Sequence, residues 1–351
     1  MSRRGVLVLG TGKRARETAL PAFHRAPDAF EVRAVFAKHA KSIDVDGRRY
    51  DVRAASELDA AALAGIDLVY CAVTKNAVPS VLAKLAALDV GSRELLIDTP
   101  VVRFKHFRHT DKLQAFKSAW VAEDCVHLPW IAPVRAAIAS GAVGAPDALG
   151  GVLFQRSAYA YHGVATAKAV LGAARVTHGR RVKLGDGMAR RTLRFADADA
   201  RAAEAWIVEP RDYAAGTLCV MGADGTIADY AHDGPGTHLR LAPVVAAGEL
   251  AGLRLGDDEH PFDDAERELV RGDAPELGLT ARMDALKRVG FLRLLRGIAR
   301  GDGGYPVDAA LEDTVVDYYL EKVGRYRATA LTDPRAPLAR ALLRLVSRAG
   351  G

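Results

Sequence analysis

The pattern of apolar and polar positions changes character partway along the chain. Up to residue 98, short runs rich in β-prone apolar residues, the first of them continuous, alternate with stretches whose apolar residues recur at helical spacing. The apolar runs lie at 5–9, 30–36, 67–73 and 94–98, and the helical stretches at 13–26, 56–64 and 78–88. A continuous apolar run is typical of a strand buried on both faces of a parallel sheet. The alternation therefore predicts βαβ units in a doubly wound parallel sheet, an α/β fold.

A different rhythm begins near residue 147. Strand-like segments follow one another, with one helical stretch at 162–171, and they lie at 148–156, 175–183, 189–196, 202–209, 215–221 and 225–231. Successive strands without intervening helices favour a mostly antiparallel, open-faced sheet in an α+β domain. Further helices are predicted at 263–271, 279–300 and 307–328, and we expect some of them to pack back on the first domain. We place the α/β domain at 1–122 and the α+β domain at 123–351.

Composition agrees with two globular domains. The chain has 351 residues, of which 50% are hydrophobic and 26% are charged, and its formal net charge is +6. Because this length exceeds the usual size of one domain, two domains are the default expectation. The positive charge favours an anionic ligand, such as a phosphate-bearing cofactor or a carboxylate substrate. No motif of a nucleic-acid-binding protein accompanies it, so we expect no nucleic-acid partner.

The cysteines and the N-terminal segment indicate a cytoplasmic protein. Cys71, Cys125 and Cys219 are far apart and flanked by apolar residues, as expected of reduced thiols in a protein core. No group of Cys and His has zinc-ligand spacing, so we expect no metal. The apolar run at 5–9 is too short for the core of a signal peptide. No run approaches the ~20 apolar residues that cross a bilayer, so we expect no membrane partner.

The turn after the first predicted strand has a recognisable motif. Gly10-Thr11-Gly12-Lys13-Arg14-Ala15 has the form GxGxxA and stands between a buried strand and a helix. In a dinucleotide-binding loop the first glycine allows a tight turn, and the second lets the backbone approach the pyrophosphate. Ala15 keeps helix and strand close, and the helix N-terminus offers free N–H groups to the anion. We therefore predict a Rossmann domain with these six residues at the cofactor; an ordinary glycine turn is the alternative.

The end of the second predicted strand favours NADP over NAD. A site that prefers NAD usually has an acidic residue there, which binds the ribose hydroxyls. This chain instead has Ala37-Lys38-His39-Ala40-Lys41, a small residue followed by cations. Cations suit a 2′-phosphate, which a carboxylate would repel. Ala37 and Lys38 are thus predicted to bind NADP. NAD is the alternative cofactor, and solvated loop charges are the alternative interpretation of the lysines.

Further segments resemble a known family of oxidoreductases. Ala72-Val73-Thr74-Lys75-Asn76 looks like a TPN segment at a strand end, 134–144 is similar to an LxxLIxSGxIG stretch, and 222–226 looks like a GxxG[ST] hairpin. In this order, after the glycine loop, they resemble the glucose–fructose oxidoreductase and inositol dehydrogenase family (Gfo/Idh/MocA). The resemblance implies a Rossmann domain followed by an α+β domain whose open sheet carries the substrate site. It also implies cofactor contacts from Thr74 and Asn76, and a homodimer or homotetramer.

This chain differs from that family in a motif that contains a catalytic lysine. The family's E-K-P segment, whose lysine lies near the nicotinamide and the substrate hydroxyl, corresponds to Asp98-Thr99-Pro100. Thr99 can donate a hydrogen bond, but it has no positive charge to stabilise an alkoxide and cannot replace the lysine as acid or base. The family's proline shapes the turn beside the cofactor, often through a cis bond, which is the role implied for Pro100. Asp98 and Thr99 are candidate catalytic residues.

A second altered motif contains the candidate acid/base. The family's D-x-G-x-H-x-x-D segment aligns its histidine with His162, which precedes Gly172 by ten residues. The accompanying aspartate is replaced by Ala165, so a partner that orients or charges the ring is missing. Imidazole can take a proton from a carbinol, and imidazolium can give one to a ketone or an imine. His162 is therefore the candidate acid/base, with a structural histidine as the alternative. Tyr161 ranks above Lys168 as a substitute for a lost group.

Two other clusters carry weaker hypotheses. Glu123, Cys125 and His127 would face one side of a strand, where we favour a pocket-lining role over a metal site. The basic and aromatic run at 103–109 follows the Pro100 turn and is expected to be an exposed loop or the start of a helix. It is a weaker candidate surface for an anionic substrate or an acyl carrier.

Together these features predict an NAD(P)-dependent oxidoreductase that transfers hydride to or from a small polar carbonyl, carbinol or imine. Loss of the motif lysine disfavours ordinary sugar or cyclitol dehydrogenation, whereas an iminium is already activated and needs less electrophilic help, as in an imine reductase. Two alternatives stay open. One is a cofactor-binding protein without redox turnover, acting as a regulator or scaffold. The other is a redox-neutral lyase or epimerase that uses bound cofactor.

Overall fold

The computed structural model describes residues 3–144, 151–155, 160–173, 175–185, 187–196, 202–209, 218–231, 233–272 and 283–349. The chain divides into two compact units. The first unit comprises Met1–Asp124, Gly290–Leu311 and Asp333–Gly351, and the second comprises Cys125–Val289 and Glu312–Thr332. Segments far apart in the sequence therefore contribute to each unit.

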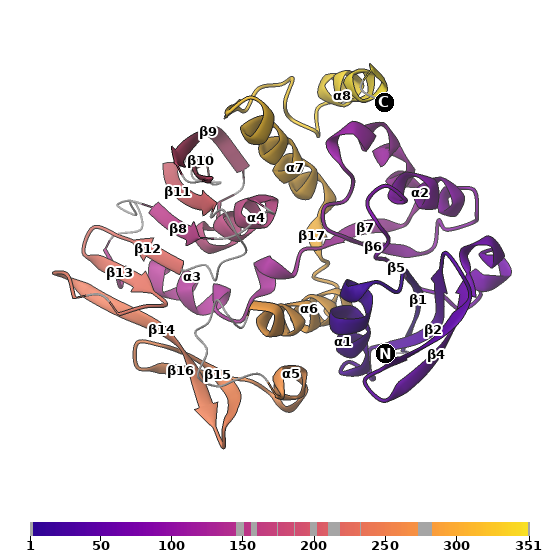
Figure 1. Cartoon of the computed structure of the whole chain (residues 1–351), viewed down its shortest axis with the longest axis horizontal. Helices are drawn as coiled ribbons and strands as arrows, with labels where there is room; N and C mark the ends of the chain where they lie inside the picture. Colours follow the sequence, from indigo (N-terminus) through magenta and orange to yellow (C-terminus); the bar gives the residue numbers. More distant parts are fainter. Residues whose placement is uncertain are drawn as a thin grey trace. The chain divides into compact units, whose positions relative to one another are not determined.

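The first unit contains an eight-stranded sheet with the order β17-β7-β6-β5-β1-β2-β4-β3 (Figure 1). Its strands are β1 (Arg4–Leu9), β2 (Phe30–Ala37), β3 (Lys41–Val45), β4 (Arg48–Ala54), β5 (Leu68–Cys71), β6 (Glu94–Asp98), β7 (Ser118–Ala122) and β17 (Tyr305–Pro306). The strands from β7 to β4 in this order are parallel, and β17 and β3 are antiparallel at the edges. The predicted doubly wound parallel sheet is confirmed, because the strand order runs in both directions from the β1–β5 pair.

The apolar runs account for the core of this sheet. Nearly all side chains of β1 and all those of β5 are buried, as expected of strands covered on both faces. Phe23, from the helix after β1, packs edge-on against Tyr70 of β5 with ring centroids 6.0 Å apart. Phe291 contacts the same tyrosine at 5.5 Å, so a helix late in the sequence helps to bury β5. Aromatic pairs in this edge-on geometry add to the stabilisation from buried area.

A hairpin that the apolar periodicity does not predict lies at one edge of this sheet. β3 and β4 are joined through Asp46 and Gly47, which have positive φ values of 53° and 72°. Two such residues form the tight turn that matches the twist of paired strands. Most side chains of both strands are exposed or half-buried, and each strand has a single fully buried position. No apolar run therefore marks them in the sequence.

The helix after β1 is irregular. Its helical backbone begins at Lys13, takes a π-helical form over Ala15–Ala19 and continues as α1 (Leu20–His24). Pro21 lies in the first turn of α1, where a missing N–H is tolerated. The π-helical segment begins at Ala15, the last residue of the GxGxxA motif, and such segments often mark functional sites.

The α-helix expected at 56–64 is wrong. This segment instead has two short 3₁₀ turns, Ala55–Glu57 and Ala61–Leu63. Asp59 lies between them, and its Oδ1 accepts a hydrogen bond from the backbone N–H of Ala62 at 2.9 Å. A side chain that bonds a nearby backbone group competes with a continuous helix, so the chain starts a new turn here.

The remaining helical segments of the first unit come from both ends of the chain. They are α2 (Val78–Ala86), the 3₁₀ segment Phe104–Ala115, α8 (Pro337–Ala349), and the parts of α6 (Met283–Arg300) and α7 (Val307–Lys322) that lie within Gly290–Leu311. The predicted helix at 78–88 is thus present, and the basic run at 103–109 forms the start of the 3₁₀ segment.

The second unit contains a ten-stranded sheet with the order β16-β15-β14-β13-β12-β8-β11-β10-β9-β18. Its strands are β8 (Gly151–Gln155), β9 (Arg175–Gly185), β10 (Met188–Ala196), β11 (Ala202–Glu209), β12 (Leu218–Met221), β13 (Gly225–Ala228), β14 (Thr237–Ala246), β15 (Glu249–Leu255), β16 (Asp258–Pro261) and β18 (Arg325–Arg327). β8 is parallel to β11 and β13 to β14, and the other neighbouring pairs are antiparallel. The mostly antiparallel α+β sheet is confirmed.

The helices of the second unit are α3 (Ile131–Ala139), α4 (Ala160–Leu171), α5 (Asp264–Val270), the part of α6 up to Val289 and the part of α7 from Glu312 onward. The helix expected at 307–328 ends earlier, at Lys322. Gly324 has a φ of +79°, and its N–H donates to the carbonyl of Tyr319 at 3.0 Å, which closes the helix and turns the chain into β18. No helix among the described residues is both long and apolar enough to cross a membrane.

Candidate functional site

The loops that follow β1 and β5 leave the first unit's sheet at the same edge. The N–H of Gly10 donates to the carbonyl of Phe36, and that of Ala72 to the carbonyl of Leu9, each at 2.8 Å. These two bonds extend the hydrogen bonding between the parallel strands as far as the first residue of each loop. In open α/β sheets, ligands bind at such a switch point, outside the carboxyl ends of the strands. The GxGxxA loop therefore lies where this architecture binds a ligand.

Gly10 and Gly12 are glycines for different reasons. Gly10 has a φ of +107°, and a Cβ there would lie 2.3 Å from the carbonyl oxygen of Ala72, so the fold itself excludes a side chain. A Cβ on Gly12 would meet no atom of the described residues within 4 Å. Packing within the described protein thus does not require glycine at position 12. A pyrophosphate that approaches the backbone closely would require it. Ala15 is fully buried, in agreement with close helix–strand packing. The loop fits a dinucleotide.

Arg14 of this loop is held by two carboxylates. Its Nε donates to Asp98 Oδ1 at 3.1 Å, and its Nη1 donates to Asp124 Oδ2 at 2.7 Å. The guanidinium carbon also lies 5.2 Å from the ring centre of Phe291. Burial alone would lower the pKa of Arg14, but Asp124 and Asp98 outweigh it and hold that pKa above its ordinary value. Arg14 therefore fixes the start of the helix against the end of β6 and the segment after β7.

Lys75 is a residue of this edge to which the sequence analysis assigns no role. Its Nζ donates to the carbonyl oxygen of Asp98 at 2.8 Å and lies 3.8 Å from Asp98 Oδ2. Burial lowers the pKa of the Lys75 ammonium, and the nearby Asp98 offsets part of that effect. Beside it, the Thr99–Pro100 peptide bond is cis, as the family resemblance implies. A cation in the turn after a buried strand at this edge is the signal that identifies Lys75.

The other residues predicted to bind cofactor lie on exposed segments of the same unit. Ala37 is the last residue of β2, and Lys38 is exposed just after it. Thr74 and Asn76 are exposed in the turn between β5 and α2. The Lys13 side chain is 72% exposed. Because β1, β2, β5 and β6 are parallel, all these segments meet at one edge of the sheet.

His162 belongs to the second unit. It lies in the first turn of α4, is 9% exposed, and its carbonyl accepts a hydrogen bond from Thr166 Oγ1 at 2.7 Å. A ring nitrogen of His162 and Sγ of Cys125, both buried, lie within 4.8 Å of each other. Tyr161 is part of α4, but its side chain lies outside the described residues. The role of His162 as acid/base stays a prediction.

Lys168 is part of a buried charge cluster. Its Nζ lies 2.6 Å from Asp313 Oδ1 and 3.1 Å from Glu312 Oε2, both on α7. The three side chains are 4–7% exposed. Burial would lower the pKa of Lys168, but Asp313 and Glu312 outweigh it and raise that pKa. A lysine held in its charged form is a poor acid or base near neutral pH, so Lys168 does not replace the motif lysine.

The strand expected around Glu123 is wrong. β7 ends one residue earlier, and Asp124–His127 form a 3₁₀ turn. In such a turn each residue advances a third of a turn, so the side chains of Cys125 and His127 do not share a face. The three residues therefore do not line one face of a strand, and their pocket-lining role stays a prediction. The neighbouring acid Asp124 is 1% exposed and binds Arg14.

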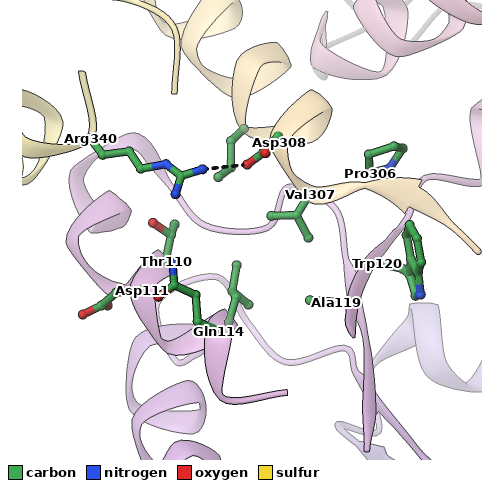
Figure 2. A pocket seen from close by; sticks show the side chains of 11 residues that line it. Thr110, Asp111, Gln114, Ala119, Trp120, Pro306, Val307, Asp308 and Arg340 are labelled. Atoms are coloured by element: carbon green, nitrogen blue, oxygen red, sulfur yellow. Dashed lines mark hydrogen bonds and ion pairs between the residues drawn. The ribbon is translucent and has the colours of Figure 1, made fainter. Parts of the chain in front are cut away.

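A cavity of about 290 Å³ lies in the first unit, near β7 and β17 (Figure 2). Thr110, Trp120, Asp308 and Arg340 are among the residues that line it. Figure 2 shows Arg340 directed at Asp308, and the two side chains are 3.2 Å apart. None of the residues predicted for cofactor binding or catalysis lines this cavity. It is therefore separate from the β1–β5 switch point, and two of its charged residues, Asp308 and Arg340, pair with each other.

No family model matches the sequence, and no curated protein matches it. Solved structures match most of the chain. Levoglucosan dehydrogenase in complex with NADH and L-sorbose is 13% identical, with a TM-score of 0.61 over 94% of this chain and 100% of that one. A putative myo-inositol dehydrogenase from Sinorhizobium meliloti is 14% identical, with a TM-score of 0.58 over 93% of this chain and 100% of that one.

A third similar structure is an oxidoreductase from Agrobacterium radiobacter in complex with NAD+, L-tartaric acid and magnesium. It is 12% identical, with a TM-score of 0.59 over 93% of this chain and 98% of that one. At such low identity these likenesses establish the fold alone. The chain has the fold of the glucose–fructose oxidoreductase and inositol dehydrogenase type (Gfo/Idh/MocA) and is a divergent example of it.

Proposed function

We propose that this protein is an NAD(P)-dependent oxidoreductase. The open space at Gly12 carries the proposal, because nothing in the described protein requires glycine there and a pyrophosphate would. Two proteins of the same fold were solved with NADH and with NAD+, which supports it. The helix N-terminus after Gly12 would hold the pyrophosphate, and the turns with Thr74 and Pro100 the nicotinamide half. Bound there, the cofactor supplies or accepts a hydride.

A titration of the purified protein with NADPH and NADH tests this proposal. We expect saturable quenching or a spectral shift of the reduced-nicotinamide fluorescence, and its absence with both cofactors would contradict the proposal. Turnover is then measured as NADPH or NADH oxidation with L-sorbose, oxaloacetate and 1-pyrroline, and as the reverse reaction with levoglucosan and myo-inositol. Tight binding without any turnover in a broad screen of carbonyls and imines favours the non-redox alternative, a regulator or scaffold.

We propose NADP(H) as the preferred cofactor, because Lys38 is exposed directly after β2 and no acidic residue stands there. Lys38→Glu should lower the ratio of NADPH affinity to NADH affinity at least about tenfold, since a carboxylate would face the 2′-phosphate. Fluorescence titrations with both cofactors measure the ratio. Lys117→Glu, at an exposed lysine just before β7, is the matched control and should leave the ratio unchanged. An unchanged ratio in Lys38→Glu would remove the argument for NADP.

We further propose that His162 is the acid/base for a small polar carbonyl, carbinol or imine. His162→Asn should lower turnover about 100-fold or more, because proton transfer by a positioned group contributes that much. Binding of NADPH should persist, since the phosphate loop belongs to the first unit. His178→Asn, at an exposed histidine of β9, is the matched control. Full turnover in His162→Asn would place the acid/base elsewhere.

A further inference from the structure

The two halves of a doubly wound sheet bind the two halves of a dinucleotide. The GxGxxA loop follows β1, so β1, β2 and β4 form the half that holds the adenine nucleotide. The half made of β5, β6 and β7 is left for the nicotinamide nucleotide. Lys75 follows β5 and hydrogen-bonds the last residue of β6. It is therefore a cation at the carboxyl edge of the nicotinamide half.

The contacts of Lys75 with the described residues fix its position without using all its donors. An ammonium has three N–H donors. One of them donates to the Asp98 carbonyl at 2.8 Å, whereas the Asp98 carboxylate is 3.8 Å away, which is too long for a hydrogen bond. That carboxylate is bonded instead by Arg14 at 3.1 Å. The Lys75 side chain is 18% exposed, so its charge is held at the edge of the sheet and only partly shielded by water.

A fixed cation distinguishes the two redox states of the cofactor. The oxidised nicotinamide ring carries a positive charge, and the reduced ring carries none. A neighbouring ammonium raises the free energy of the oxidised complex by Coulomb repulsion and leaves the reduced complex nearly unaffected. Thr99, at the adjacent turn, brings no charge that would do this. The same ammonium would also stabilise negative charge on a reacting substrate oxygen.

We propose that Lys75 is a catalytic residue that faces the nicotinamide ring of the bound cofactor and makes this protein prefer the reduced cofactor. The proposal rests on the proposed oxidoreductase function. It assigns to the end of β5 the positive charge that Asp98-Thr99-Pro100 does not supply. It also explains why a lysine, with its cost of partial burial, stands in the turn that follows a buried strand.

The test measures the affinities of the oxidised and reduced cofactor separately, so it needs no substrate. NADP+, NADPH, NAD+ and NADH are titrated calorimetrically into the wild type and into Lys75→Met, Lys75→Arg and Lys117→Met. We expect Lys75→Met to lower the ratio of the oxidised to the reduced dissociation constant about fivefold. Lys75→Arg, which keeps the charge, and Lys117→Met, at an exposed lysine of the same unit, should keep the wild-type ratio.

The outcomes separate this proposal from the one on which it rests. A wild type that binds none of the four nucleotides overturns both. A wild type that binds them, with an unchanged ratio in Lys75→Met, overturns the role of Lys75 and leaves the oxidoreductase proposal standing. If Lys75→Met binds the oxidised and the reduced cofactor more weakly by the same factor, the proposed role of Lys75 is also overturned, because the loss of a purely structural lysine would have that effect. Thermal unfolding of each variant confirms that the titrated protein is folded.

Discussion

Replacing Gly12 with aspartate should weaken NADPH binding about 100-fold or more while leaving the protein as stable as the wild type. The new carboxylate would stand where we place the pyrophosphate, and repulsion between charges a few ångströms apart accounts for a loss of this size. Stability should be preserved because the added atoms meet open space. Gly12 also stands just before the helix, and its carbonyl accepts from the N–H of Arg16 at 3.1 Å. Aspartate is a favoured residue at such an N-cap position.

Gly10→Ala is the matched comparison for this variant. Its Cβ would lie 2.3 Å from the carbonyl oxygen of Ala72 at a φ of +107°, so we expect a loss of stability rather than a selective loss of binding. Urea unfolding and NADPH titration of both variants give the two readouts. Undiminished NADPH binding by folded Gly12→Asp would show that the loop is an ordinary glycine turn.

The parts of the fold that the sequence predicts are those in which burial alone dictates residue type. β1 and β5 are buried along nearly their whole length, so their positions must all be apolar and the pattern is visible without any partner. β14 is different, because Leu241 is its one fully buried position among half-buried and exposed ones. Its pairing with β13 and β15 depends on the rest of the sheet, so no local pattern reveals it.

The same distinction applies to the site. The GxGxxA loop can be recognised locally, since the turn, the strand before it and the helix after it are contiguous in the chain. The residues that the loop's side chains contact are distant in the sequence. Arg14 binds Asp124 across 110 positions of sequence, and Lys75 binds Asp98 across 23. Both pairs exist because strand order places the ends of β1, β5, β6 and β7 along one edge. The sequence analysis therefore finds the loop but misses Lys75.

Lys168→Met should destabilise the protein by about 3–5 kcal/mol. Lys168 is 5% exposed, and its removal would take from the buried carboxylates of Glu312 and Asp313 the cation that they share. Glu312 would keep the half-buried Arg175, whose Nε lies 3.8 Å from it. Breaking a buried ion pair from one side costs this much because the remaining charge keeps its desolvation penalty. Methionine has a similar length and fills most of the space, so the loss would report charge rather than packing. Urea-induced unfolding at neutral pH measures it.

Two controls distinguish this explanation from a general effect of mutation. The triple variant Lys168→Met, Glu312→Gln, Asp313→Asn removes the cluster's charge together and should recover most of the lost stability, because no carboxylate is then left unpaired. Arg194→Met breaks the exposed pair with Glu204, whose side chains are 68% and 28% exposed, and should change stability by less than about 1 kcal/mol. If Lys168→Met lowered the free energy of unfolding no more than Arg194→Met does, the carboxylates of Glu312 and Asp313 would be solvated. The contacts of Lys168 with these carboxylates would then not stabilise the packing of α4 on α7.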